Sequence, residues 1–315
     1  MKYIQLDEEW ESQIVNLWNR ELGSDFPMRE ELFKQNSTQD PHVLLSGSYL
    51  AVTEQNKLIG FVITKCIQDK KETLLNQDVG WIQVLLVDSA FREKGIGSVL
   101  VENAEKALQK QGCKTIYLGC DPAHYFPGVP LRFENTKKWF EKRGYQASGI
   151  VSDLNRTCTP DEQFGFRKPM DIEVSLAEDK DELLSFLHCC FPGRWEYEAK
   201  QYFNNGGTGR EFVVFRKEKR IIGFCRINDS KSPIIGPNVY WAPLFEDEVG
   251  GVGPLGIDKN ERKNGYGLAI VEAGISFLRE RHIDNIIIDW TGLLDFYKKI
   301  DFKVWKQYQQ YSKHI

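Results

Sequence analysis

The chain has 315 residues, of which 41% are hydrophobic and 27% are charged, and its formal net charge is −4. This composition excludes a disordered or fibrous protein, and the length suits two domains of about 150 residues each. No run of about 18 apolar residues predicts a membrane span. The weakly acidic balance gives no basic footprint for nucleic acid.

The seven cysteines include no CxxC pair, and the five histidines are scattered. The sequence therefore predicts reduced thiols, no metal site and a cytoplasmic location. The opening residues MKYIQLDEEW lack the apolar run of a signal peptide, so we expect no export. We expect a monomer or a homodimer.

In chain order, the first half predicts two helices, a hairpin, a strand, a long helix, a buried strand, a short helix and a closing strand. The helices are expected at 7–22 and 28–35, the hairpin around 58–63, the next strand up to Val87, the long helix over 96–108 and the buried strand from Lys114. Apolar residues in the long helix recur at intervals of three and four, which is typical of an amphipathic helix.

The second half repeats this order. LIGFVI at 58–63 matches IIGFC at 221–225, VDSAFREKGIGSVL from Val87 matches IDKNERKNGYGLAI from Ile257, and WFEKRGY at 139–145 matches FYKKIDF at 296–302. Three matched segments in the same order predict a duplicated domain.

We expect the first copy at 1–165 and the second at 170–315. The boundary is predicted in 157–171, a polar segment interrupted by proline. The early helices of the second copy are expected at 179–190 and 195–204. Each copy is predicted to be an α/β (α+β) domain.

Both copies carry the pattern R-x-x-G-x-G between a strand and a helix, at 92–97 and 262–267. Glycines allow a tight turn and a close approach of the backbone to a ligand. The first N–H groups of the following helix have no partner within it, so the turn can hold a diphosphate, to which the arginine could add charge. The residues 251–256 spell GxGxxG, but apolar strand residues follow and the helix begins only after Arg262, so we expect a strand there.

The repeated order of elements around R-x-x-G-x-G resembles the GNAT (Gcn5-related) N-acetyltransferase family, present twice as in tandem enzymes such as mycothiol synthase. The resemblance implies two domains, each with a splayed mixed β-sheet flanked by helices. It also implies acetyl-CoA as the cofactor, with its diphosphate on the glycine turn and its pantetheine beside the preceding strand. The residues implied are Leu85, Leu86, Val87, Arg92, Glu93, Lys94, Gly95, Ile96 and Gly97 in the first copy, and Leu255, Gly256, Ile257, Arg262, Lys263, Asn264, Gly265, Tyr266 and Gly267 in the second.

Members of the family often use a tyrosine of the last helix as the general acid, in a Y-x-K-x-G-F context. The second copy has Tyr297 at this position, although Asp301 replaces the usual glycine. The first copy has Phe140, and a phenyl ring cannot donate a proton. The resemblance therefore implies a catalytic second copy and a first copy that is degenerate in catalysis.

Three carboxylates are candidates for the general base in the second copy. Asp289 ends the apolar strand NIIID, where the thioester is expected, and Asp247 and Glu248 lie just before the cofactor strand. A solvated surface carboxylate is the alternative for all three, and water alone can suffice as a base. In the first copy we expect the proline-rich segment 121–135 to be a structured loop rather than a lid, with His124 as a packing residue.

Together these features predict an acetyl-CoA-dependent N-acetyltransferase that acts on the primary amine of a small molecule. The alternatives are a peptide or protein N-acetyltransferase, or a non-catalytic protein that senses acyl-CoA. The expected partner is a small-molecule amine, and neither nucleic acid nor a membrane is expected. The acceptor pocket is built from variable helices and loops, so the sequence does not identify the amine.

Overall fold

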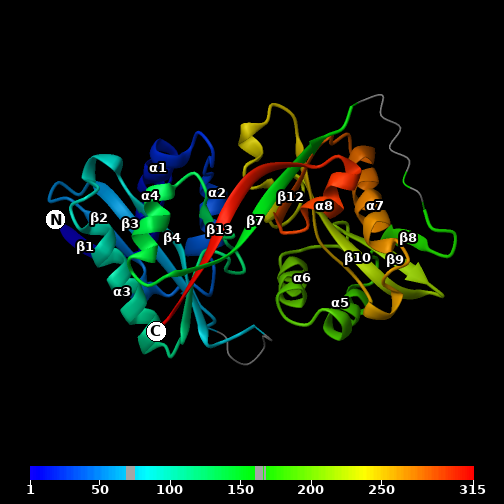
Figure 1. Ribbon diagram of the computed structural model, residues 1–315, viewed down its shortest axis with the longest axis horizontal. Coiled ribbons are helices and arrows are strands. Elements are labelled where there is room, and N and C mark those ends of the chain that lie inside the picture. Colours follow the sequence, from blue (N-terminus) through cyan, green and yellow to red (C-terminus); the bar gives the residue numbers. More distant parts are fainter. Residues whose placement is uncertain (69–74, 160–165, 167) are drawn as a thin grey trace. The chain divides into compact units, whose positions relative to one another are not determined.

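Two compact units make up the chain in the computed structural model, which describes residues 1–68, 75–159, 166 and 168–315 (Figure 1). The first unit comprises Met1–Val151 and Gln307–Ile315, and the second comprises Ser152–Lys306. The predicted boundary at 157–171 includes residues that lie outside the described part of the chain.

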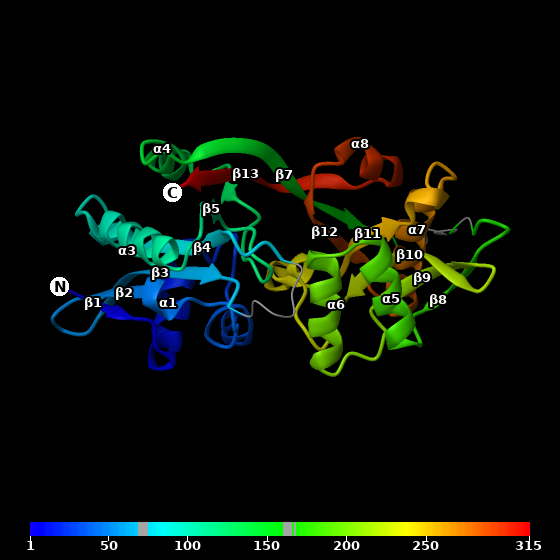
Figure 2. The same ribbon diagram turned by 90° about the horizontal axis from the view of Figure 1, so that it is seen from below.

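The first unit has a mixed sheet in the order β1-β2-β3-β4-β5-β13, in which only β4 and β5 are parallel. Its elements are β1 (Lys2–Gln5), α1 (Glu11–Leu22), α2 (Glu30–Phe33), β2 (Tyr49–Val52), β3 (Leu58–Cys66), β4 (Val79–Val87), α3 (Ile96–Lys110), β5 (Thr115–Leu118), β6 (Val129–Pro130) and α4 (Glu134–Glu141). All nine residues of β3 are buried. The reason is that α1 and α3 cover opposite faces of the sheet (Figure 2).

The second unit has the same topology, in the order β8-β9-β10-β11-β12-β7 with only β11 and β12 parallel. Its elements are β8 (Glu173–Leu176), α5 (Lys180–Cys190), α6 (Arg194–Asn204), β9 (Phe212–Lys217), β10 (Arg220–Asn228), β11 (Val249–Ile257), α7 (Tyr266–Glu280), β12 (Asn285–Thr291) and α8 (Leu294–Tyr297). The predicted duplication is thus visible strand by strand.

The closing strands are exchanged between the two copies. The strand after α4, β7 (Gln146–Thr157), pairs with β12 of the second unit. The strand after α8, β13 (Lys303–His314), pairs with β5 of the first unit through Ser312–His314. The first compact unit therefore includes most of β13, and the second includes the end of β7. The ranges 1–165 and 170–315 instead assign each closing strand to the copy that precedes it.

Each sheet opens between its two parallel strands. The pairing of β4 with β5 ends at Ile82 and Leu118, and that of β11 with β12 ends at Gly251 and Ile287. Beyond these points β4 and β11 continue for several residues, paired only on their other side with β3 and β10. This is the splayed mixed sheet that the sequence predicts, and it leaves one backbone edge open in each unit.

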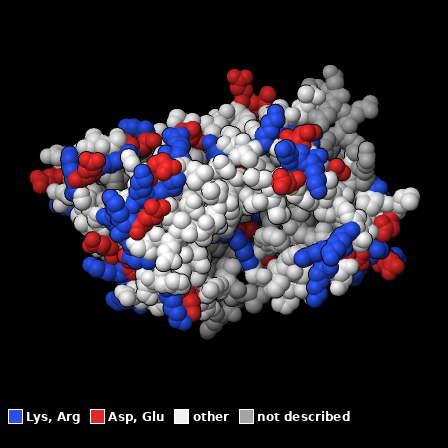
Figure 3. All heavy atoms as spheres, viewed as in Figure 1, with Lys and Arg blue, Asp and Glu red and all other residues white. Residues whose placement is uncertain are grey.

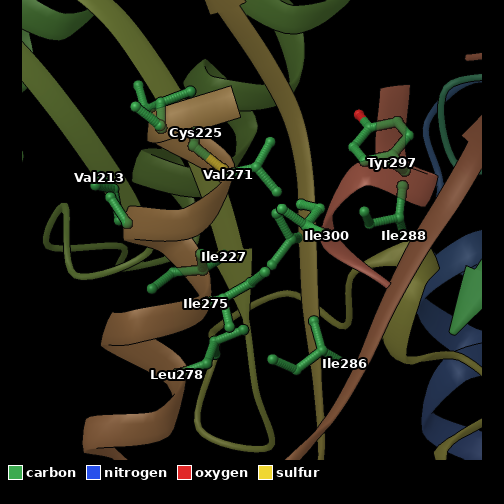
Figure 4. Close-up of a cluster of buried hydrophobic side chains, with 14 of the residues drawn as sticks. Val213, Cys225, Ile227, Val271, Ile275, Leu278, Ile286, Ile288, Tyr297 and Ile300 are labelled. Carbon is green, nitrogen blue, oxygen red and sulfur yellow. The ribbon is translucent and has the colours of Figure 1, made fainter. Parts of the chain in front are cut away.

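Buried side chains hold α7 against the sheet of the second unit (Figure 4). Val271, Ile275 and Leu278 of the helix meet Ile227 and other residues of the strands. A second cluster packs α5 and α6 on the opposite face. Complete burial of one such side chain contributes about 1.5–3 kcal/mol, so these two clusters fix the strands that carry the open edge.

Candidate active site

The glycine turns of the two copies adopt the same conformation. Gly95 has φ +81° and Gly265 has φ +80°, and each lies immediately before its helix, α3 or α7. A Cβ on either glycine would meet no atom within 4 Å, so the positive φ rather than crowding favours glycine. Both helices have 15 residues, and their first N–H groups are directed toward the turn.

The arginine that begins each turn holds the turn closed. Arg92 Nε donates to the carbonyl oxygen of Val87 at 3.0 Å, and Arg262 Nε donates to that of Ile257 at 3.1 Å. The Arg92 guanidinium also pairs with Glu21 at 2.7 Å. Nε of each arginine is therefore occupied, and only the rest of the guanidinium could contact a diphosphate. In the first copy the negative charge of Glu21 also offsets the charge of Arg92.

The open backbone edge is formed by alternate residues of β4 and β11. Asp88 N–H donates to Ile59 on β3, and Asp258 N–H donates to Ile222 on β10. Because backbone groups alternate in direction along a strand, the N–H and C=O groups of Val87 and Ile257 point away from those neighbours. The same holds two residues earlier, at Leu85 and Leu255. The carbonyl oxygens of Val87 and Ile257 already accept from the turn arginines, but an amide-containing ligand can pair with the remaining groups as an added strand.

A cavity of about 1130 Å³ lies along the open edge of the first unit. Eight of the nine first-copy positions predicted for the cofactor line it, and Lys94 is the exception. Trp139 and Phe140 of α4 close one side. The volume slightly exceeds the range for small-molecule pockets, which ends at about 1,000 Å³, so this unit has room for a large ligand beside its glycine turn.

The other face of the first unit is filled by the proline-rich loop. Phe126 stacks on Trp18 with ring centroids 5.6 Å apart and meets Phe26 edge-on at 4.9 Å. His124 is buried with an exposed fraction of 2%, and Lys65 is buried between Asp40 and Asp121 at 2.9 and 2.7 Å. These residues form a packed core, as expected for a structured loop.

Tyr297 lies at the end of α8 and is 6% exposed. Its ring packs edge-on against Phe296 and Phe302. Its hydroxyl makes no hydrogen bond with any residue that the structure describes, and it is directed away from Ile288 and Ile300 (Figure 4). Burial raises the pKa of this phenol above its ordinary value, so it carries its proton at neutral pH.

Asp289 lies on a β-bulge near the end of β12. Ile288 faces Leu154 but Thr291 faces Ser152, so three residue steps on β12 match two on β7. Trp290 has φ +45°, and its N–H donates to Asp153 at 3.1 Å. Bulges redirect the side chains next to them.

The surroundings of Asp289 suit a general base. The pKa of Asp289 is raised to about 7, first by burial and then by the negative charges of Asp153 and Glu198, against the opposing effect of Arg194. The Asp289 side chain is therefore ionised in about half of the molecules near neutral pH, which is the condition for efficient proton abstraction.

The structure brings Asp289 and Tyr297 together at the open edge but does not bring Glu248 to them. The negative charge of Asp289 contributes to the raised pKa of Tyr297, as expected for neighbouring groups. Glu248 is exposed, accepts hydrogen bonds from Ser230 and precedes β11. It is about 20 Å from Leu255 along the strand.

Three residues near Asp289 were not predicted from the sequence. Arg194 and Glu198 pair at 2.6 Å across one turn of α6, and their four-residue spacing was a detectable signal. Asp153 had no such signal, because it reaches this unit only through the exchanged strand β7. Within the described residues, no group of three or more metal-ligating side chains is assembled and no helix is long and apolar enough to cross a membrane.

Comparisons with known proteins match both copies. The model of the acetyltransferase (GNAT) family matches residues 8–127 and again residues 180–302. A solved region described as a GCN5-related glucosamine N-acetyltransferase region of a fungal multi-domain GH3 β-N-acetylglucosaminidase superposes with a TM-score of 0.86 at 23% identity, over 99% of this chain. This chain spans 38% of that longer protein.

Two further structures match nearly the whole chain. A GCN5-related N-acetyltransferase from Sphaerobacter thermophilus has a TM-score of 0.71 at 14% identity, over 99% of this chain and 95% of that one. A tandem GNAT protein from the clavulanic acid biosynthesis pathway has a TM-score of 0.68 at 12% identity, over 99% and 98%. A search of curated proteins found no match. At these identities the likeness shows the fold.

Proposed function

The chain belongs to the acetyltransferase (GNAT) family and contains its fold twice, and we propose that it is an acetyl-CoA-dependent N-acetyltransferase whose second copy performs the chemistry. The observation that carries the proposal is that Asp289, whose pKa is raised to about 7, lies close enough to Tyr297 for its charge to raise the pKa of the phenol. The first copy has Gly119 and Phe140 at the equivalent positions. The chain thus provides its own comparison between a reactive and an unreactive copy.

In the second copy the cofactor would be held by the turn 262–267 and by the edge from Leu255 to Ile257. The turn fits this role because it has the same dihedral angles as the turn beside the cavity of the first unit. Bound acetyl-CoA supplies an acetyl group activated as a thioester. The N–H groups of Leu255 and Ile257 point to this edge, so they are the donors that it offers to a developing oxyanion.

Asp289 would take the proton that the acceptor ammonium must lose before it can attack. A carboxylate with a pKa of about 7 is a stronger base than an ordinary aspartate and still partly ionised at neutral pH. Tyr297 holds its proton under the same conditions and can donate it to the leaving sulfur. Base and acid therefore have the protonation states that the reaction needs.

The first copy would bind the same cofactor without using it. Its cavity follows the glycine turn and the open edge of β4, but it lacks both the acid and the base. Its opposite face is filled by Phe126 and Tyr125, which are buried. We propose that cofactor bound there supports the fold of the first unit.

A small amine is the acceptor that the surface favours. On the face shown in Figure 3, acidic and basic side chains are interspersed and form no continuous basic tract of the kind that binds nucleic acid. The similar fungal region is described as a glucosamine N-acetyltransferase region, so amino sugars belong in the first panel of amines. Amino acids and polyamines complete the panel.

The test is thiol release from acetyl-CoA in the presence of each amine. We expect amine-dependent release together with an acetylated amine by mass spectrometry. A second candidate function is acyl-CoA sensing, favoured by the cavity beside Phe140 in the first unit. Tight CoA binding with no release for any amine would refute the transferase and support the sensor.

A further inference from the structure

Arg226 is a buried cation without a partner in the described part of the chain. It lies on β10 and is 5% exposed. Its Nε and Nη2 are enclosed and make no hydrogen bond. The guanidinium lies over the rings of Tyr202 and Phe212 at 5.6 and 5.8 Å. Attraction to the two ring faces offsets part of the cost of burying this charge, and no hydrogen bond to Nε or Nη2 offsets the rest.

Neighbouring carboxylates are already engaged by other groups. Glu211, which precedes β9, accepts from the Tyr202 hydroxyl at 2.5 Å and pairs with Arg210 at 2.7 Å. Asp229, which follows β10, is shared by Arg210 and Arg281 at 2.6 and 2.9 Å. In the described part of the chain, no carboxylate forms a salt bridge or a hydrogen bond with the Arg226 guanidinium.

The side of the sheet on which Arg226 lies is the side away from the glycine turn. Cys225 and Ile227 belong to the cluster under α7 (Figure 4). Because side chains alternate along a strand, Arg226 faces the other way, toward α6. This is also the helix whose Arg194 and Glu198 act on the pKa of Asp289. Arg226 and the groups that act on Asp289 thus lie on the same side of the sheet.

A second unsatisfied group lies two residues along the same face. Asn228 is fully buried, and its Nδ2 donates to Asn238 at 3.0 Å, but its Oδ1 is enclosed without a partner. Donors on Arg226 and an acceptor on Asn228 therefore lie on the same face of β10, two residues apart. Together they would match a ligand that carries both an anionic group and a hydrogen-bond donor.

The first copy provides the comparison. Gly60 and Gly223 each face the last residue of the neighbouring strand, Val87 or Ile257, and this register aligns Arg226 with Ile63. The only buried cation on that face of β3 in the first copy is Lys65, which has two carboxylate partners. The copy whose acceptor face is filled thus has no unpaired cation there, and the copy with the base and the acid has one.

We propose that Arg226 binds an anionic group of the acceptor, so that the acceptor is an amine that also carries a carboxylate or a phosphate. This rests on the proposed function, because it assumes that the second copy holds the acceptor. The planar guanidinium offers paired donors that match either anion. Arg226 is then a determinant of specificity, and its unpaired state is the form that awaits the substrate.

Calorimetric titration of two matched pairs of amines tests the proposal. The pairs are glucosamine 6-phosphate with glucosamine, and an α-amino acid with its amide. We expect wild-type protein to bind the anionic member of at least one pair ten to a hundred times more tightly. Arg226→Met should reduce this ratio to near one, and Arg226→Lys should retain part of it. A preference within the glucosamine pair indicates that Arg226 binds a phosphate, and a preference within the amino-acid pair indicates a carboxylate.

Lys219→Met is the matched control, because it removes the same charge from the exposed turn of the same hairpin, and it should leave the ratio unchanged. Thermal unfolding checks folding, and Arg226→Met should melt no lower than wild type because an unpaired buried charge is removed. Three results would overturn the proposal. They are equal affinity for both members of each pair, no binding of any of the four amines, and a preference that survives in Arg226→Met. Binding that depends on Arg226 with no acetyl transfer would uphold it and refute the transferase.

Discussion

Replacing Asp289 by asparagine should suppress acetyl transfer and at the same time stabilise the protein at alkaline pH. With the pKa of Asp289 at about 7, the ionised fraction rises from about 10% at pH 6 to about 90% at pH 8, so kcat/KM of the wild type should rise about ninefold over this range. Asp289→Asn should abolish this rise and lower kcat by a factor on the order of 10²–10⁴.

The stability effect has the opposite sign. The folded protein holds a proton on Asp289 up to a pH of about 7, whereas the unfolded chain releases it near pH 4, so stability falls as the pH rises between these values. Above pH 7 the ionised side chain costs at most about 4 kcal/mol, and its partial exposure reduces this figure. Asp289→Asn should therefore be more stable than wild type at pH 8, with no advantage below pH 4.

Urea unfolding at pH 4, 6 and 8 and steady-state kinetics from pH 6 to 8 measure both effects. Glu248→Gln makes the same charge change at another predicted base, which is exposed, and should alter neither profile. A wild-type rate that is flat with pH, or an inflection lost in Glu248→Gln and kept in Asp289→Asn, would refute the assignment of the base.

Other substitutions separate the acid from the packing residues. Tyr297→Phe should lower kcat by a factor on the order of 10²–10⁴ in pre-steady-state assays, with CoA affinity unchanged by calorimetry; a normal kcat would reduce Tyr297 to a packing role. Phe140→Tyr should create no activity in the first copy, because the loop fills its acceptor face, and turnover that survives Tyr297→Phe in this background would contradict this. Phe126→Ala should lower the free energy of unfolding by about 3–5 kcal/mol without changing kcat, and a stability equal to wild type would show that the loop is not part of the core.

Much of the fold follows from local patterns that recur in both halves. The helix predicted at 179–190 is observed as α5, and Asp179 caps it by accepting from the N–H groups of Asp181 and Glu182. The exchange of β7 and β13 was not predictable, because both are long closing strands after a short helix and neither carries a local signal for its partner. Pairing of this kind depends on contacts distant in sequence.

The same limit applies to the site. The position of Tyr297 follows from its sequence context, and Asp289 was marked by its place at the end of an apolar strand. The raised pKa of Asp289 depends on Asp153, which comes from the other copy's closing strand, and on Glu198 of α6. Arg226 likewise lacks a salt bridge because Glu211 and Asp229 pair with other arginines in the folded chain. A sequence pattern does not reveal such pairings.

The central claim, that the second copy performs the chemistry, is tested most directly by comparing Gly95→Asp with Gly265→Asp. Each change places a carboxylate in a glycine turn of identical conformation, with open space around the new side chain. The negative charge should repel a bound diphosphate in that copy only. We predict that Gly265→Asp abolishes amine-dependent thiol release and that Gly95→Asp retains it. Activity lost in Gly95→Asp and kept in Gly265→Asp would contradict the account and move the active site to the first copy.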